Sequence, residues 1–129
     1  GWQYQKLAPA IDFTPGTTTI TWTSTDDFGN QSVCSQDITV EDNEPPVILN
    51  CPSDVLHATD AGNCSAVVNG IDPVTDDNCG VTKQTWTFTG ATIRNSSPTG
   101  INNASGEIFN TGITTVTYTI VDEAGNSDN

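Results

Sequence analysis

The chain has 129 residues, of which only 34% are hydrophobic, so it can form one ordinary domain, or one domain and part of another, around a thin core. Its 16 acidic residues against 3 lysines and arginines give a formal net charge of -13, which excludes nucleic acid as a partner because its phosphates would be repelled. No apolar run approaches the roughly 18 residues of a membrane-spanning helix, so no membrane insertion is expected.

Period-two alternation predicts a strand near the N-terminus. Ile20 and Trp22 alternate with threonines in the segment GTTTITWTST, so we expect these two side chains to face a core and the threonines to face solvent. The acidic turn Asp26-Asp27-Phe28-Gly29-Asn30 follows, because Asp, Gly and Asn favour tight turns. A second strand is expected over Val33–Val40.

An acidic, proline-containing segment follows this predicted hairpin. Residues 41–46 read EDNEPP. Each proline fixes its own φ and biases the preceding residue toward extended geometry. The segment is therefore expected to be a stiff, extended connector that carries several carboxylates.

Three more strands are expected in the middle of the chain, over Val55–Thr59, Ser65–Asn69 and Lys83–Thr89. Turn signals separate them, with DAGN at 60–63 and DDNCG at 76–80. Short strands joined by regular turns, without helical periodicity, predict an antiparallel β-sandwich.

The C-terminal segment repeats the N-terminal one. Residues 112–126 read GITTVTYTIVDEAGN and match residues 16–30, GTTTITWTSTDDFGN, at a constant offset of 96 residues that places Tyr118 on Trp22. This offset is too long for a solenoid repeat and matches one immunoglobulin-sized sandwich. We therefore expect an all-β tandem repeat of immunoglobulin-like antiparallel sandwiches. Residues 1–42 would be the C-terminal part of a preceding repeat, and residues 43–129 a nearly complete one.

The order of four motifs resembles a hyalin repeat (HYR) module: EDNEPPVILNCPSDV, DAGNCSAVV, DPVTDDNCG and FNTGITTVTYTIVDEAGN. The form with extra cysteines is similar to tandem repeats in very large surface proteins of Bacteroidota, including gliding-motility adhesins. The resemblance implies an immunoglobulin-like fold, a role in cell adhesion and an extracellular or cell-surface location. Expected partners are neighbouring repeats of the same chain, and surface glycans or other cell-surface proteins.

Four cysteines favour disulfide bonds in an exported protein, because no pair has the close spacing of a zinc site. We predict a bond between Cys64 and Cys79, which would stabilise the domain by roughly 3 kcal/mol. The HYR resemblance implies that Cys51 pairs with a cysteine near the last strand of its module, at a position beyond this sequence. Cys34 and Cys51 are therefore expected either to be unpaired or to bond to each other.

The acidic turns and the connector are candidate calcium ligands, because calcium prefers six to eight oxygen atoms. The connector is similar to the acidic linkers of cadherins, where calcium stiffens successive modules. The alternative is that Asp and Asn serve only as turn residues. The first candidate set converges on the connector and contains Asp26, Asp27, Asp42, Glu44, Asp76, Asp77 and Asn78. The second set, for the next junction, contains Asp122, Glu123 and Asn126.

No catalytic function is expected, because His57 is the single histidine and no nucleophile motif accompanies it. The sequence favours a stalk or spacer in an adhesin. The alternative is a carbohydrate-binding accessory module of a secreted enzyme, in which Trp86 and Phe88 would stack on sugars. Their alternation with threonines instead favours a place in the core.

Overall fold

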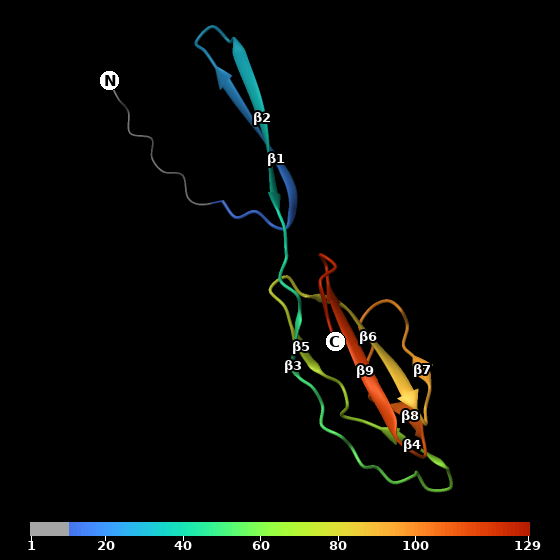
Figure 1. Ribbon diagram of the computed structural model, residues 1–129. Coiled ribbons are helices and arrows are strands. Elements are labelled where there is room, and N and C mark those ends of the chain that lie inside the picture. Colours follow the sequence, from blue (N-terminus) through green and yellow to red (C-terminus); the bar gives the residue numbers. More distant parts are fainter. Residues whose placement is uncertain (1–10) are drawn as a thin grey trace. The chain divides into compact units, whose positions relative to one another are not determined.

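The computed structural model describes residues 11–129, which form antiparallel strands and no helix (Figure 1). A search of these residues for a membrane-spanning helix finds none. The chain divides into two compact units, Gly1–Asp42 and Asn43–Asn129. The expected all-β, antiparallel fold class is therefore confirmed.

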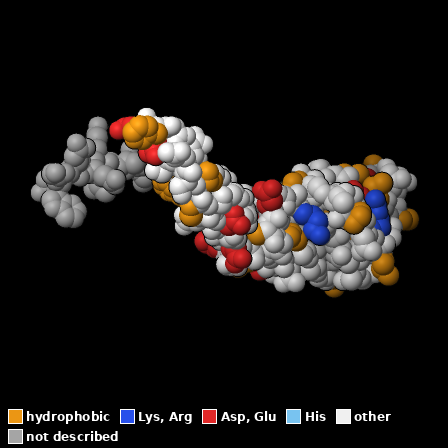
Figure 2. Space-filling view, turned by 90° about the horizontal axis from the view of Figure 1, so that it is seen from above, with side chains coloured by type: hydrophobic (Ala, Val, Ile, Leu, Met, Phe, Trp, Pro, Cys, Tyr) orange, Lys and Arg blue, Asp and Glu red, His pale blue; other side chains and the backbone are white. Residues whose placement is uncertain are grey.

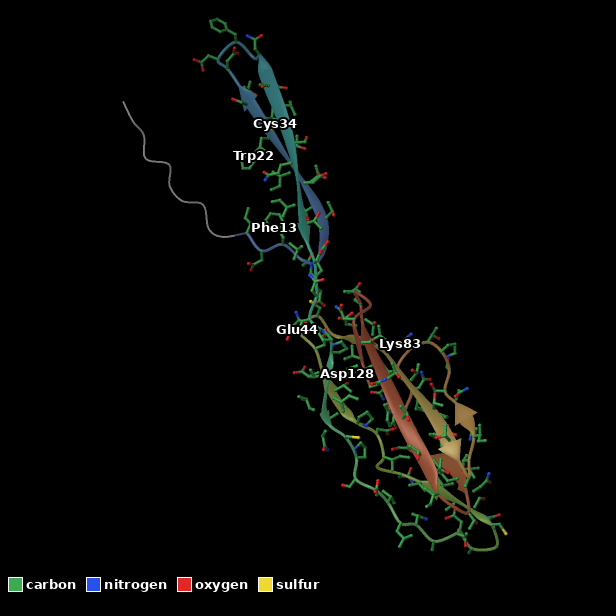
Figure 3. All side chains as sticks on the ribbon, viewed as in Figure 1. Phe13, Trp22, Cys34, Glu44, Lys83 and Asp128 are labelled. Atoms are coloured by element: carbon green, nitrogen blue, oxygen red, sulfur yellow. The ribbon has the colours of Figure 1, made fainter. Side chains whose placement is uncertain are left out.

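The first unit contains one antiparallel hairpin. Strand β1 (Gly16–Thr25) pairs with strand β2 (Gln31–Val40) along its whole length, with Trp22 opposite Cys34 (Figure 3). The two predicted strands are therefore confirmed. The expectation that Trp22 faces a core is wrong for the described residues, because its side chain is 61% exposed. Among residues 11–42, which the structure describes, no second layer covers this face of the hairpin.

The second unit is built from three small sheets. Antiparallel pairs join β3 (Val47–Asn50) to β5 (Val74–Asp76) and β4 (Ser65–Val68) to β8 (Glu107–Asn110). A four-stranded sheet has the order β10 (Ser127–Asp128), β9 (Thr114–Asp122), β6 (Val81–Gly90) and β7 (Arg94–Asn95).

The core of the second unit lies between these sheets, as in an immunoglobulin-like sandwich. Trp86 and Phe88 on β6 are buried and stack with their ring centroids 4.0 Å apart, which confirms the predicted core positions. Phe109 on β8 lies 4.8 Å from Phe88, measured between ring centroids, and Tyr118 on β9 completes the cluster. The alternation of β6 and β9 puts these large side chains inward and the intervening threonines outward or at the margin.

The predicted strand over Val55–Thr59 is wrong, because these residues form no strand. They precede β4, where the Asp60 carboxylate accepts the backbone N–H of Val67 at 2.9 Å. The Asp60 side chain thus occupies the Val67 N–H, which a neighbouring strand would otherwise use. Residues 55–59 therefore remain outside the sheet.

Candidate functional site

Three aspartates converge beside the N-terminal end of the second unit. One carboxylate oxygen from each of Asp42, Asp77 and Asp122 lies within 4.8 Å of the others. Asp42 follows β2 and immediately precedes Asn43, the first residue of the second unit. Asp77 follows β5, and Asp122 is the last residue of β9. We call these three residues the aspartate cluster.

Asp122 is held by its own turn. The backbone N–H and the side-chain Nδ2 of Asn126 donate to its two carboxylate oxygens, each at 2.8 Å. The residue is only 3% exposed. Burial opposes ionisation, but the hydrogen bonds from Asn126 outweigh it and lower the pKa of Asp122 below its ordinary value. Asp122 is therefore an ionised, preoriented carboxylate at neutral pH.

The two carboxylate oxygens of Asp77 differ in their hydrogen bonding. Its Oδ2 accepts the backbone N–H of Cys79 at 2.8 Å, whereas its Oδ1 is buried and accepts no hydrogen bond from a described residue. The Nδ2 of Asn126 donates to the backbone carbonyl of Glu44 at 3.4 Å, which ties the Asp122 turn to the connector. Carbonyl and carboxylate oxygens are thus gathered in one place.

The charges of the aspartate cluster are costly without a cation. Two unit charges 4.8 Å apart repel by about 3 to 4 kcal/mol at an effective dielectric constant of about 20. The chain has only 3 basic residues, and Arg94 is already paired with Glu107 at 2.7 Å. Acidic side chains outnumber basic ones on the face seen in Figure 2. An oxygen-preferring cation is therefore chemically suited to this site.

The structure does not bring the first candidate set together as expected. Asp26 and Asp27 lie in the turn between β1 and β2, whereas Asp42 lies beyond the far end of β2. The ten residues of β2 separate them by about 30 Å. The proposed convergence of these two aspartates with Asp42 is therefore wrong.

The second candidate set also changes. Asp122 was expected to serve a different junction from Asp42 and Asp77, yet it lies beside both. The side chains of Glu44, Asp76, Asn78 and Glu123 are exposed, and none belongs to the aspartate cluster. Asn126 contributes by positioning Asp122.

None of the four exposed cysteines forms a disulfide bond in the described part of the chain: Cys34, Cys51, Cys64 and Cys79. The Cys64 carbonyl accepts the Thr111 hydroxyl just before β9, whereas Cys79 donates to Asp77 beside the last residue of β9. The length of β9 separates these two places by about 26 Å, far more than the roughly 7 Å that a disulfide permits between Cα atoms. The predicted bond between Cys64 and Cys79 is absent from this structure.

The sequence did not single out Asp72, which binds the core tyrosine. The Tyr118 hydroxyl donates to Asp72 Oδ1 at 2.8 Å and lies 3.1 Å from the Ile71 carbonyl. Burial and the contact with Asp72 raise the pKa of Tyr118. A signal for a polar partner was present in the sequence, because the alternating pattern of the repeat marks Tyr118 as a core position. A buried tyrosine hydroxyl then requires a polar partner nearby.

Comparisons with known proteins agree with the architecture. The family model described as HYR domain matches residues 41–129, a range that includes the whole aspartate cluster. Hyalin of Strongylocentrotus purpuratus is 34% identical over 122 residues, and hyalin of Lytechinus variegatus is 32% identical over 120 residues. Each alignment covers 92% of this chain, but only 9% and 20% of the respective relatives. No solved structure matches.

Proposed function

Because this chain belongs to the HYR domain family, we propose that it is a non-catalytic adhesive or spacer module of an extracellular or cell-surface protein. The relatives that it matches are named hyalin, and the chain spans a fifth of their length or less. Its sandwich presents edges and turns to neighbouring modules and to surface glycans or proteins. The resemblance to Bacteroidota adhesins extends this proposal to gliding motility.

The observation that carries the finer proposal is the aspartate cluster. Calcium occupies it and fixes the connector, residues 41–46, to the module that follows. Asp42 is supplied by the connector, whereas Asp77 directly follows β5 and Asp122 ends β9. A cation that draws these three carboxylates together therefore restricts the motion of the connector.

The tandem arrangement belongs to the same proposal. The turn after β1 repeats the turn after β9, since Asn30 donates to both Asp26 oxygens at 2.9 and 2.8 Å. Asn126 makes the equivalent bonds to Asp122 at a distance of 96 residues along the chain. Residues 1–42 are accordingly proposed to be the end of a preceding HYR-like repeat.

The structure argues against the carbohydrate-binding alternative, because Trp86, the side chain expected to stack on a sugar, is buried. Trp86 is 5% exposed and stacks on Phe88, so its face is not available to a sugar ring. Glycan binding through other surfaces would be detected on a glycan array, with Trp86→Phe expected to leave any signal unchanged.

Thermal unfolding of the 129-residue protein, with calcium and with a chelator, tests the calcium site. At a hundredfold excess over its dissociation constant, calcium is expected to add about 2.7 kcal/mol to the free energy of unfolding. Asp77→Asn and Asp122→Asn should each remove most of this gain, since each deletes a charged ligand. Asp26→Asn is the matched control, because it alters the same kind of turn outside the aspartate cluster.

A calcium gain that survives Asp77→Asn would contradict the assigned site, and no gain in the unaltered protein would remove calcium from the proposal. Small-angle scattering addresses the connector separately. Calcium should narrow the range of molecular dimensions that scattering measures for the unaltered protein, because the connector becomes less mobile. The Asp42→Asn variant should show no such narrowing.

A further inference from the structure

Strand β9 carries a carboxylate at the end of its buried row. Tyr118, Ile120 and Asp122 occupy alternate positions of β9, and all three are buried. Alternate residues of a strand share one face, so Asp122 projects to the same side as the core residues. The partner strand β6 therefore has to leave room for a charged group at the margin of an apolar core.

Strand β6 meets Asp122 with one extra residue. Each residue of β6 from Lys83 onward pairs with one residue of β9, and Lys83, labelled in Figure 3, faces Val121. Asp122 then faces Val81, so Thr82 has no residue of its own opposite. Two residues of one strand against one residue of its partner form a β-bulge, which often redirects side chains beside functional sites.

The bulge changes where the Thr82 side chain lies. An unbroken register would place Thr82 opposite Asp122, with its side chain in the buried row of β6 that contains Gln84. Instead Thr82 is exposed, and its hydroxyl donates to the backbone carbonyl of Val121 at 3.3 Å. This hydrogen bond ties the bulge to the residue that directly precedes Asp122.

The bulge also sets the position of Asp77. This aspartate lies in the turn of residues 77–80, which leads directly into β6. Removing one residue at the bulge would move the turn along β9 by about 3.3 Å, the rise per residue of a strand. Calcium–oxygen bonds measure about 2.3–2.6 Å, so a displacement of that size would prevent Asp77 and Asp122 from sharing one ion.

We propose that the β-bulge at Thr82 positions Asp77 and Asp122 to share one calcium ion, with Thr82 as a positioning residue whose hydroxyl holds the bulge in place. This inference rests on the proposed calcium site and adds to it a residue that touches no ion. One carboxylate oxygen from each aspartate lies within 4.8 Å of the other, close enough for one calcium ion to bridge them. Because Thr82 acts through the backbone of Val121, its effect should appear in calcium affinity.

Isothermal titration calorimetry with calcium chloride tests this role in the 129-residue protein. Thr82→Val keeps the branched shape but removes the hydroxyl, and should weaken calcium binding by roughly two- to tenfold, as expected for loss of one hydrogen bond. Thr82→Ser should retain the affinity, because it keeps the hydroxyl. Thr87→Val is the matched control, since Thr87 is an exposed threonine in the regular part of the same strand.

Deleting Thr82 tests the bulge itself. The deletion restores a one-to-one register and should weaken calcium binding by roughly tenfold or more, the usual effect of misplacing a metal ligand through its support. Near-ultraviolet circular dichroism of the core aromatic residues shows whether this variant is folded. Where it does not fold, the comparison of Thr82→Val with Thr87→Val decides.

The outcomes separate this inference from the calcium site. If Thr82→Val binds calcium as tightly as the unaltered protein, or if Thr87→Val loses as much affinity, the positioning role is overturned while the calcium site stands. If the unaltered protein binds no calcium, the calcium site and the positioning role are overturned together.

Discussion

Asp72 joins three segments of the second unit through a single carboxylate oxygen. Tyr118 donates its hydroxyl at 2.8 Å, and the backbone amides of Ala104 and Ser105 donate at 2.7 and 3.1 Å. Burial opposes ionisation of Asp72, but hydrogen bonds from Ser105, Tyr118 and Ala104 outweigh it, so its pKa lies below the ordinary value. The ionised carboxylate therefore stabilises the folded state at neutral pH.

Acid should remove this contribution. The folded-state pKa of Asp72 is lower than the unfolded value of 3.8, so the folded protein binds fewer protons. The stabilisation is complete above the unfolded value and declines as pH falls toward the folded value. Urea unfolding should therefore show Asp72→Asn well below the unaltered protein at pH 7, with the gap narrowing below about pH 4. A gap that stays constant between neutral and acid pH would contradict this role.

The site was partly predictable at the level of single residues. All three members of the aspartate cluster, Asp42, Asp77 and Asp122, were candidates from their place in turns and in the connector. Their grouping was wrong because turn chemistry identifies ligand types and not their partners. Asp26 is separated from Asp42 by a whole strand of its hairpin. Asp122, its counterpart in the repeat, folds back to the N-terminal end of the second unit.

At the level of elements, strand length decided most of what the sequence predicted, and β4, with four residues, is the short strand that was nevertheless predicted. Strands β6 and β9 have ten and nine residues, long enough for alternation to mark their inner faces. Strands β3, β5 and β7 have four residues or fewer and carry no periodic signal. Their places follow from tertiary pairing, which a local pattern does not contain.

The end of β6 depends on a glycine that packing makes necessary. Gly90 has φ +101°, and a Cβ atom there would lie 2.3 Å from the backbone carbonyl oxygen of Ile113. Gly62 has φ +81° with no atom within 4 Å of such a Cβ. Both glycines satisfy a left-handed backbone, but only Gly90 also permits close approach of two backbone segments.

Substitution by alanine should separate these two effects. Gly62→Ala is expected to cost about 1 to 2 kcal/mol of unfolding free energy, the usual penalty for a left-handed residue with a Cβ. Gly90→Ala should cost clearly more, because β6 must also move away from Ile113. Chemical denaturation of both variants measures the difference. Equal losses would mean that the contact at Gly90 relaxes without strain.

At the level of the whole molecule, the charge of -13 and the aspartate cluster act over different ranges. General repulsion among 16 acidic residues is spread over the surface and is screened by any salt. Repulsion within the aspartate cluster acts over less than 5 Å, where a diffuse ion atmosphere is ineffective. Monovalent salt and calcium should therefore stabilise the protein by separable mechanisms.

Measured melting temperatures should resolve the two mechanisms. Raising NaCl from about 0.01 M to about 0.15 M shortens the screening length from about 30 Å to about 8 Å, and should stabilise the unaltered protein and Asp77→Asn alike. Calcium added at constant ionic strength should then raise the melting temperature of the unaltered protein only. If NaCl alone reproduces the calcium effect, or if Asp77→Asn responds equally to calcium, the cation acts through general screening and the cluster is not a binding site.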